Sequence, residues 1–408
     1  MSIEFSFSPE QRLLQRSLRQ YLREEIEPRL PVDDWTGHGG HSPMDLVKEM
    51  QQKGYFGMSI PREYGGAGMG EVGYCITMEE VSRVDASIVT ILGAHTGIGL
   101  MPIYLFGNEE QREQYARPAS DGREIAAFAL TEPTAGSDAA SIKTTAKREG
   151  DEYVLNGTKI WCSNGNFADT LTVFAVTDET LGAHGGVTCF IVDKKEAEKQ
   201  GLRVGTIEDK LGIRHSNTAE LIFEDLHVPK ENILGKVGEG FIVALTALDG
   251  GRVGLAAGAL GGAKRTLEDC VDFVKKRERF GKRIGDNQSI QWMLADMATD
   301  IHMQQHAVYH AATLTNEYYH RIAEGEPVSR SLRERVSRAA AATKIFGSEM
   351  MGRHLEYAIQ IQGGEALRAR NMLERGFRDQ HITEIYEGTN EIQRMIIARE
   401  LMSQGVPQ

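Results

Sequence analysis

Cysteine and long hydrophobic runs are both scarce in this chain. Its 408 residues include four cysteines, Cys75, Cys162, Cys189 and Cys270, and no two of them form a CxxC pair. This wide spacing excludes a disulfide framework or a cysteine zinc site and favours reduced thiols, so we expect a cytoplasmic protein. No uncharged apolar run reaches the roughly 18 residues of a membrane helix, which predicts no membrane span.

Basic residues are outnumbered by acidic ones. The chain has 46 Lys and Arg against 58 Asp and Glu, a formal net charge of −12. Affinity for a phosphate backbone needs clustered Lys and Arg, so this balance argues against a nucleic-acid-binding protein. Hydrophobic residues make up 41% and charged residues 25%, as in soluble globular proteins, and the length predicts about two to four domains.

The character of the sequence changes twice along the chain, which predicts three domains. Residues 1–125 are helical in pattern, beginning at Ser8-Pro9-Glu10-Gln11, a capped helix start. Residues 126–236 contain short β-branched segments without intervening helices, and residues 237–408 contain long amphipathic stretches. These stretches are 241–276, 292–319, 331–362 and 389–402. We expect an α+β multidomain fold with an N-terminal helical domain, a middle antiparallel β-barrel domain and a C-terminal four-helix bundle.

The middle domain contains individual strand signals. Residues 171–176, 187–192 and 219–223 are rich in β-branched and aromatic residues, as strands are. Tyr153-Val154-Leu155 and Lys159-Ile160-Trp161 flank Asn156-Gly157, a dipeptide typical of two-residue hairpin turns. We therefore expect a β-hairpin at this point.

Two motif matches are weak. Residues 68–73 match GxGxxG, but a dinucleotide fingerprint follows a strand in a βαβ unit, and here a loop precedes it, so a loop is favoured. His302, His306 and His310 share one helix face at a spacing that could bind a metal. No HExxH pattern accompanies them, so a solvated helix surface is favoured and we expect no metal site.

Glycines recur at every fourth position in the first long C-terminal stretch. Gly250, Gly254, Gly258 and Gly262 would form one stripe without side chains on a helix. Each interior glycine costs about 1 kcal/mol relative to alanine, so the stripe indicates a close approach. A flat ligand and tight helix packing explain it equally well.

Two further segments have residues suited to chemistry. Residues 128–138 end an apolar run in a polar turn, whose N–H groups could bind a heterocycle or simply end a strand. Glu387 follows two apolar residues and precedes Gly388 and Thr389. A carboxylate in an apolar pocket has a raised pKa and suits a general base. An ordinary acidic helix cap explains Glu387 equally well.

Taken together, six segments in order resemble the acyl-CoA dehydrogenase family over nearly the whole chain. They are Pro61-Arg62-Glu63-Tyr64-Gly65-Gly66, Leu130 to Asp138, Lys159 to Gly165, Arg277 to Gly281, Gln360 to Gly364 and Tyr386 to Thr389. The resemblance implies a flavoprotein that binds FAD and forms a homotetramer, a dimer of dimers.

The resemblance also implies roles for individual residues. Those implied at the isoalloxazine are Phe128, Leu130, Thr131, Trp161 and Ser163. Those implied at the rest of FAD are Arg277, Phe280, Gln288, Thr389 and Glu391, with Gln360, Gly363 and Gly364 from a neighbouring subunit. Those implied at the acyl-CoA are Ser137, Asp249, Gly250, Gly251, Arg252, Tyr386 and Gly388.

By the same resemblance, Glu387 is the general base that removes the α-proton of the thioester. Its N–H and a ribityl hydroxyl would stabilise the thioester oxygen, and flavin N5 would accept the β-hydride. The product is a trans-2-enoyl-CoA, and the electrons pass to an electron-transfer flavoprotein. Some relatives carry the base at the position of Gly251, which cannot serve here.

Departures from the family pattern leave the acyl group open. The arginine of glutaryl-type enzymes corresponds to Val89, which disfavours that substrate. Glu365, Arg368 and Arg370 follow Gly364 where the family more often has a polar-aromatic run. Branched, cyclic and carboxylated acyl groups stay open beside straight chains. Alternative functions are an acyl-CoA oxidase using dioxygen, a non-catalytic binding or assembly relative and, least favoured, a flavin monooxygenase relative.

Overall fold

The N-terminal region is helical, as expected. The computed structural model describes residues 7–30, 42–369 and 371–404. The first helices are α1 (Pro9–Tyr21), α2 (Met44–Gln52), α3 (Gly70–Ser82), α4 (Ala86–Leu92), α5 (Met101–Phe106), α6 (Glu109–Gln111) and α7 (Arg117–Ser120). The capping box of α1 is confirmed, because Ser8 Oγ accepts the Gln11 N–H at 3.2 Å and Gln11 Oε1 accepts the Ser8 N–H at 2.9 Å.

The middle region forms one sheet that does not close into a barrel. Its strands are β1 (Ala126–Ala129), β2 (Thr145–Glu149), β3 (Glu152–Ser163), β4 (Thr170–Val176), β5 (Val187–Asp193), β6 (Leu202–Ile207), β7 (Thr218–Pro229) and β8 (Ile233–Leu234). The order is β6-β7-β3-β2-β4-β5-β8, with β1 paired to β4. The short helices α8 (Ala183–Gly186) and α9 (Lys194–Ala197) flank β5.

The expected antiparallel barrel is therefore wrong in two respects. β1 and β2 run parallel to β4, so the sheet is mixed. The end strands β6 and β8 do not pair with each other within the described residues, and β8 has only two residues for a ladder. The three expected strand segments in residues 171–223 are confirmed as β4, β5 and part of β7.

The expected hairpin at Asn156-Gly157 is also wrong. β3 continues through this dipeptide as one strand of 12 residues. Gly157 has a positive φ of 151°, which L side chains rarely adopt, and the register against β7 shifts between Leu155 and Gly157. A Cβ on Gly157 would lie 2.8 Å from Thr144 Cα, so this glycine permits a bulge and a close strand contact.

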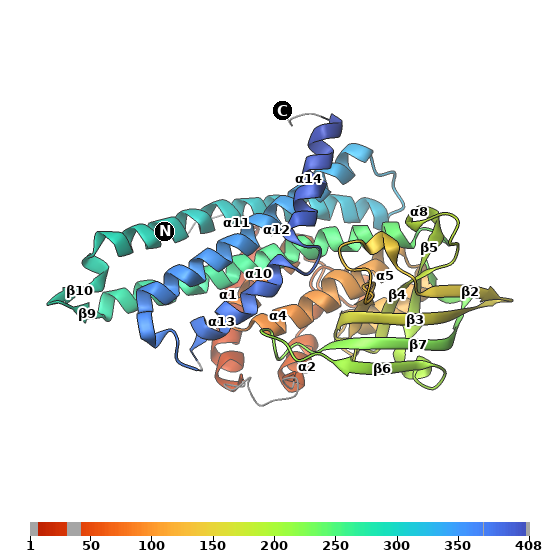
Figure 1. The fold of residues 1–408 in the computed structure, drawn as a ribbon, viewed down its shortest axis with the longest axis horizontal. Coiled ribbons are helices and arrows are strands. Elements are labelled where there is room, and N and C mark those ends of the chain that lie inside the picture. Colours follow the sequence, from red (N-terminus) through yellow and green to blue (C-terminus); the bar gives the residue numbers. More distant parts are fainter. Residues whose placement is uncertain (1–6, 31–41, 370, 405–408) are drawn as a thin grey trace.

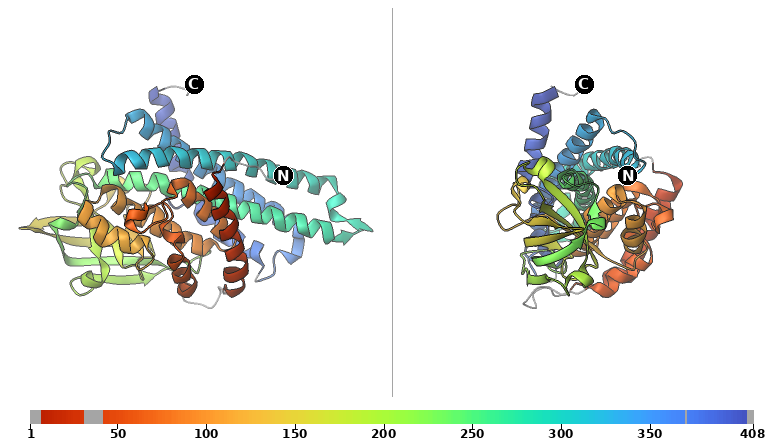
Figure 2. Two further views of the ribbon diagram at one scale, coloured as in Figure 1. Left: turned by 180° about the vertical axis from the view of Figure 1, so that it is seen from behind. Right: turned by 90° about the vertical axis from the view of Figure 1, so that its right-hand side faces the viewer.

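The C-terminal region is helical and elongated. Its helices are α10 (Gly240–Lys276), α11 (Gln288–Ala323), α12 (Arg330–Gln362), α13 (Met372–Gln380) and α14 (Asn390–Gln404), and β9 (Glu278–Arg279) and β10 (Lys282–Arg283) join α10 to α11. α10, α11 and α12 lie side by side, whereas α14 projects steeply from them (Figures 1 and 2). The expected helical character of the C-terminal region is thus confirmed, and three of its long helices pack lengthwise.

Two helical stretches are long and apolar enough to cross a membrane by length and composition alone. They are Ala86–Phe106 and Gly240–Lys276, and 83% and 78% of their most apolar windows are buried inside the protein. This burial is typical of core helices. The four cysteines are free and buried, as expected for reduced thiols.

Candidate active site

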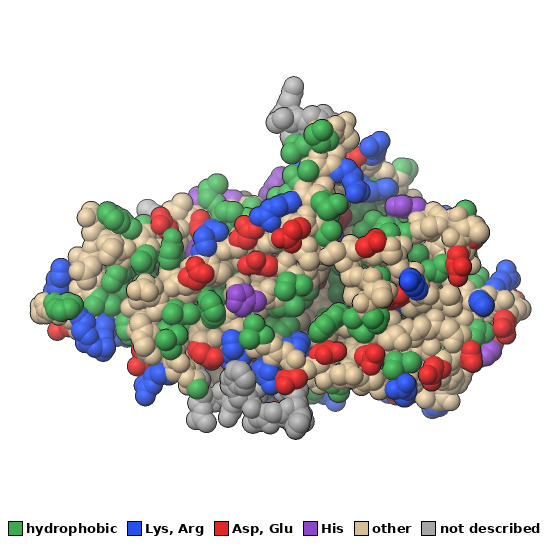
Figure 3. Space-filling model, in the orientation of Figure 1, with side chains coloured by type: hydrophobic (Ala, Val, Ile, Leu, Met, Phe, Trp, Pro, Cys, Tyr) green, Lys and Arg blue, Asp and Glu red, His purple; other side chains and the backbone are tan. Residues whose placement is uncertain are grey.

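A cavity of about 1480 Å³ lies where the sheet, α4, α10 and α13 meet. The space-filling view is hollowed between the sheet and the helices (Figure 3). The cavity exceeds the roughly 300–1,000 Å³ of a pocket for one small ligand, so it has room for two ligands side by side.

Glu387 lies in this cavity, directly against α10. It follows the 3₁₀ turn His381–Glu384 and has a positive φ of 58°, a conformation that few non-glycine residues adopt. A Cβ on Gly251 would lie 2.8 Å from Glu387 Cδ, so the carboxyl group occupies the space that any side chain at 251 would need. The Oε2 atom is buried and has no hydrogen-bond partner among the described residues.

Arg252 holds the backbone of Glu387 in place. Its Nε donates to the Glu387 carbonyl oxygen at 3.0 Å, and its Nη1 pairs with Asp249 Oδ1 at 2.7 Å. Asp249 Oδ2 in turn accepts from the Ser337 hydroxyl at 2.5 Å. This chain anchors the strained turn to α10 and α12, which explains how the positive φ persists.

The electrostatics of Glu387 suit a base near neutral pH. Burial raises the pKa of Glu387 to about 7, while the charges of Arg252 and Lys344 act in the opposite direction. Lys344 is fully buried on α12, and its Nζ donates to Asn390 Oδ1 at 2.8 Å. Asn390 begins α14 immediately after the turn that carries Glu387, so this cation is fixed behind the base.

A buried ion pair braces the cavity wall that the sheet contributes. Lys159 Nζ on β3 lies 2.7 Å from Glu132 Oε1 and donates to the Leu130 carbonyl at 2.9 Å. The Glu132 carboxylate also accepts the N–H groups of Lys143 and Thr144. The polar turn after β1 is thereby tied to the strand that carries Trp161 into the cavity.

The structure brings together most of the residues expected at the site. Besides Glu387, the cavity is lined by twelve of them: Phe128, Leu130, Thr131, Ser137, Trp161, Ser163, Asp249, Gly251, Arg252, Tyr386, Gly388 and Thr389. Trp161 has a positive φ of 58° and a side chain that is 55% exposed, so an aromatic face is left uncovered.

Other expected residues lie outside the cavity of their own chain. They are Arg277, Phe280, Gln288, Gln360, Gly363, Gly364 and Glu391. Phe280 is fully exposed beside the β9–β10 ribbon at the far end of α10 (Figure 1). Gly250 faces away from the cavity, because a Cβ there would lie 2.9 Å from Tyr319 Cζ.

The two weak motifs lie at the start of α3 and on α11. Gly68 and Gly70 have positive φ angles at the start of α3, and the described residues before them contain no strand. The rings of His302 and His306 lie 4.8 Å apart on an exposed face of α11. Within the described residues, no group of three His, Cys, Asp or Glu side chains is arranged to hold a metal ion.

Sequence reasoning missed the buried lysines and the anchoring role of Arg252. Arg252 was expected at the substrate, but its guanidinium contacts Asp249 and the Glu387 backbone. Lys344 lies in an ordinary amphipathic stretch and gave no signal of its own. Lys159 and Glu132 each lie in a motif-like segment, but nothing in the chain order indicates that they pair.

Known proteins match this chain over its whole length. Family models for acyl-CoA dehydrogenases match the N-terminal domain at residues 8–123, the middle domain at 127–226 and the C-terminal domain at 238–402. An acyl-CoA dehydrogenase of Bacillus subtilis is 42% identical over 96% of this chain and 98% of its own length.

Two solved structures are similarly close. Butyryl-CoA dehydrogenase of Megasphaera elsdenii is 36% identical with a TM-score of 0.88, covering 98% of this chain and 100% of that chain. A chain in the structure of the electron transferring flavoprotein of Acidaminococcus fermentans is 41% identical with a TM-score of 0.89, at the same 98% and 100% coverage. Matches to all three domains, and a relative 42% identical over 96% of this chain, show that the chain belongs to the acyl-CoA dehydrogenase family.

Proposed function

We propose that this protein is an FAD-dependent acyl-CoA dehydrogenase that converts an acyl-CoA thioester to a trans-2-enoyl-CoA. One observation carries this proposal. The Glu387 carboxyl group, with an unpartnered Oε2, lies over Gly251 in the same cavity as the expected flavin-facing residues of the sheet.

Glu387 accepts the α-proton of the thioester at its carboxylate. This proton is weakly acidic, so the base must be desolvated and correctly placed. The raised pKa of about 7 makes the carboxylate basic while leaving much of it ionised at neutral pH. Arg252 keeps the turn in position, and Gly251 lets the carboxyl group approach α10.

The sheet side of the cavity fits FAD. The isoalloxazine would be held by Phe128, Leu130, Thr131, Trp161 and Ser163. The uncovered face of Trp161 suits a flat ring. FAD, when bound, supplies the acceptor for the β-hydride. The protein orients the ring against the thioester and excludes water from between them.

The acyl-CoA enters from the N-terminal half of α10. Phe241, Leu245 and Leu248 line this branch together with His184 and Ser137. Tyr386 and Gly388 flank the base, and the Glu387 N–H would donate to the thioester oxygen. Asp249 contributes by holding Arg252, because both are buried and paired with each other.

We propose that electrons leave to an electron-transfer flavoprotein and that the protein acts as a homotetramer, a dimer of dimers. The first part is supported by the similarity to a chain solved with such a flavoprotein. The second is supported by the exposed Phe280 and by the distance of the β9–β10 ribbon from its own cavity. Six of the residues expected at FAD would then reach it across a subunit interface: Arg277, Phe280, Gln288, Gln360, Gly363 and Gly364. The fourth helix of the expected bundle, α14, would pack within that assembly. The tetramer is tested by light scattering, which measures the molar mass of the wild type and of Phe280→Ser in solution.

Glu387→Gln tests the function. The variant is expected to fold and stay yellow but to lose at least 10²–10⁴-fold in anaerobic flavin bleaching, the range of general-base catalysis. Glu384→Gln, three residues earlier and outside the cavity, is the control. Retained bleaching by Glu387→Gln would remove Glu387 from the mechanism. Rapid reoxidation by air would indicate an oxidase, and protein without flavin a non-catalytic relative.

A further inference from the structure

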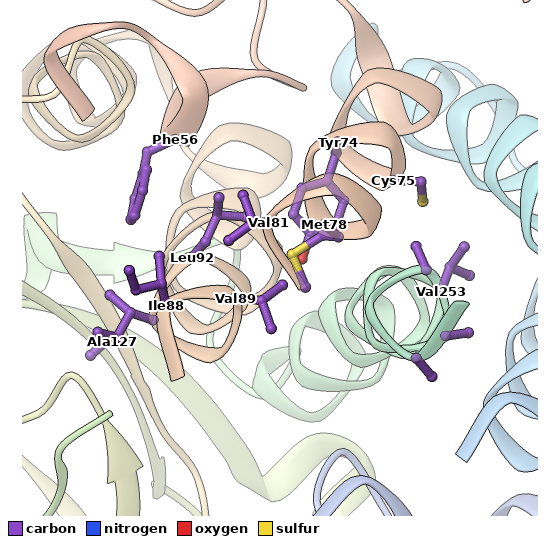
Figure 4. Packing of buried hydrophobic residues seen from close by; sticks show 14 of the residues in the cluster. Phe56, Tyr74, Cys75, Met78, Val81, Ile88, Val89, Leu92, Ala127 and Val253 are labelled. Carbon is purple, nitrogen blue, oxygen red and sulfur yellow. The ribbon is translucent and has the colours of Figure 1, made fainter. Parts of the chain in front are cut away.

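The cavity continues past Glu387 along α10, beyond the reacting atoms. On α10 this extension is lined by Leu255, Gly258, Ala259 and Gly262. Met78 of α3 and Val89 of α4 face them, and both side chains point toward α10 (Figure 4). These residues give the part of the extension next to Glu387 an apolar lining.

The extension is long compared with a short acyl group. From Gly251, which carries the base against it, to Gly262, α10 rises by about 16 Å. A butyryl group extends only two carbons beyond the carbon that loses its proton. A short-chain substrate would leave most of this apolar extension unfilled.

The four glycines of the α10 stripe divide into two pairs with different surroundings. Gly250 and Gly254 pack against tyrosines, since a Cβ on Gly254 would lie 2.6 Å from Tyr74 Oη. Gly258 and Gly262 line the cavity. Packing therefore explains the first pair, and the second pair keeps the lumen open.

Side chains at the second pair would fill the lumen. A Cβ on Gly258 would already contact Val89 Cγ2 at 3.8 Å, so a longer side chain must turn into the lumen. A Cβ on Gly262 would lie 3.1 Å from Met351 Cε. Met351 thus borders the lumen at this point, and its flexible thioether can adapt to an acyl tail.

The far end of the extension is not built for a charged tail. Three arginines line it, and each has an acidic partner. Arg265 pairs with Glu27 at 2.8 Å, Arg83 with Glu268 at 2.5 Å, and Arg375 lies 3.6 Å from Asp85. A terminal carboxylate would have to displace one of these partners, whereas a hydrocarbon needs none.

We infer that the acyl group is an uncharged chain of medium to long length, extended along α10 toward Met351. This inference rests on the proposed function and names its substrate class. It departs from butyryl-CoA dehydrogenase, the similar structure whose name specifies a short substrate.

The test is kcat/KM for butyryl-, octanoyl-, lauroyl- and palmitoyl-CoA with the FAD-loaded enzyme under anaerobic conditions. The kcat/KM value relative to that for butyryl-CoA is expected to rise by roughly fourfold for each added CH₂, because this factor corresponds to the free energy of burying one methylene. The rise should stop when the tail reaches Met351. A maximum at butyryl-CoA would overturn the inference. Failure of every thioester to bleach the flavin would instead overturn the proposed function.

Two matched variants locate the tail. Gly258→Leu and Gly262→Leu should both lower the ratio of kcat/KM for lauroyl-CoA to that for butyryl-CoA. The longest chain that still reacts well should be shorter for Gly258→Leu, because residue 258 lies nearer the base. Equal ratios in the wild type and both variants would refute the placement. If either variant loses FAD, the deciding measurement uses the wild type with lauroyl-CoA that bears a terminal carboxylate. It should react at least 10²-fold more slowly than lauroyl-CoA, and equal rates would contradict an uncharged tail.

Discussion

The carboxyl group of Glu387 occupies the space beside Gly251 where a side chain would otherwise stand. A Cβ built on Gly251 would lie 2.8 Å from both Cδ and Oε1 of Glu387. The glycine and the carboxylate are therefore one structural unit, since the base can reach its position only because α10 has no side chain there.

Gly251→Ala should displace the base without removing it. The added methyl overlaps the carboxyl group, so Glu387 must rotate or the turn must shift. We expect kcat/KM to fall about 10²-fold, as for a displacement of about 1 Å at a catalytic group, with FAD content unchanged. Stopped-flow bleaching and the flavin spectrum measure the two quantities. Full activity in this variant would contradict the observed geometry.

The pH dependence of kcat/KM should report Glu387 and its neighbour Lys344. The base acts as a carboxylate, so activity should rise with pH through an apparent pKa near 7. The Lys344 charge lowers the pKa of Glu387, so Lys344→Met should move this limb to higher pH. Lys236→Met, at an exposed lysine, is the control. An unmoved limb in Lys344→Met would show that the cation does not act on the base.

Stability should also depend on Glu387, in the opposite direction to activity. The pKa of Glu387 is raised from 4.5 to about 7 in the folded state, so folding is favoured while the group is protonated and loses this advantage as pH rises from 4.5 to 7. The free energy of unfolding of Glu387→Gln should therefore exceed that of the wild type by up to about 3 kcal/mol at pH 8, and by little at pH 4. Thermal melts of FAD-free protein across this range measure the difference. A gain that is independent of pH would contradict a titrating carboxyl group.

Lys159→Met should damage the sheet wall of the site. It leaves the Glu132 carboxylate buried without its cation, which costs about 3–5 kcal/mol. It also removes the bond to the Leu130 carbonyl, so FAD should be lost more readily. Adding Glu132→Gln to this variant should restore part of the melting temperature. If the double variant melts lower still, repulsion from an unpaired charge is not the cause.

Local sequence signals predicted most of the helices and strands. The capping residues of α1, the long amphipathic helices and the strand segments are confirmed because their causes act within a few residues. The hairpin at Asn156-Gly157 failed because the same dipeptide also permits a bulge, and the close approach of Thr144, just before β2, decides between them. The barrel failed because closure depends on whether the end strands meet, which no segment encodes alone.

The sequence by itself determined most helices and strands and the family segments, and it singled out Glu387 as the candidate base. The tertiary structure alone decided that Glu387 lies against Gly251, that Lys344 and Arg252 lie behind it, and that half of the glycine stripe faces a lumen while half faces tyrosines. The physical reason is that burial and electrostatic shifts depend on contacts between distant segments. Such contacts produce no periodic pattern in the sequence of either segment.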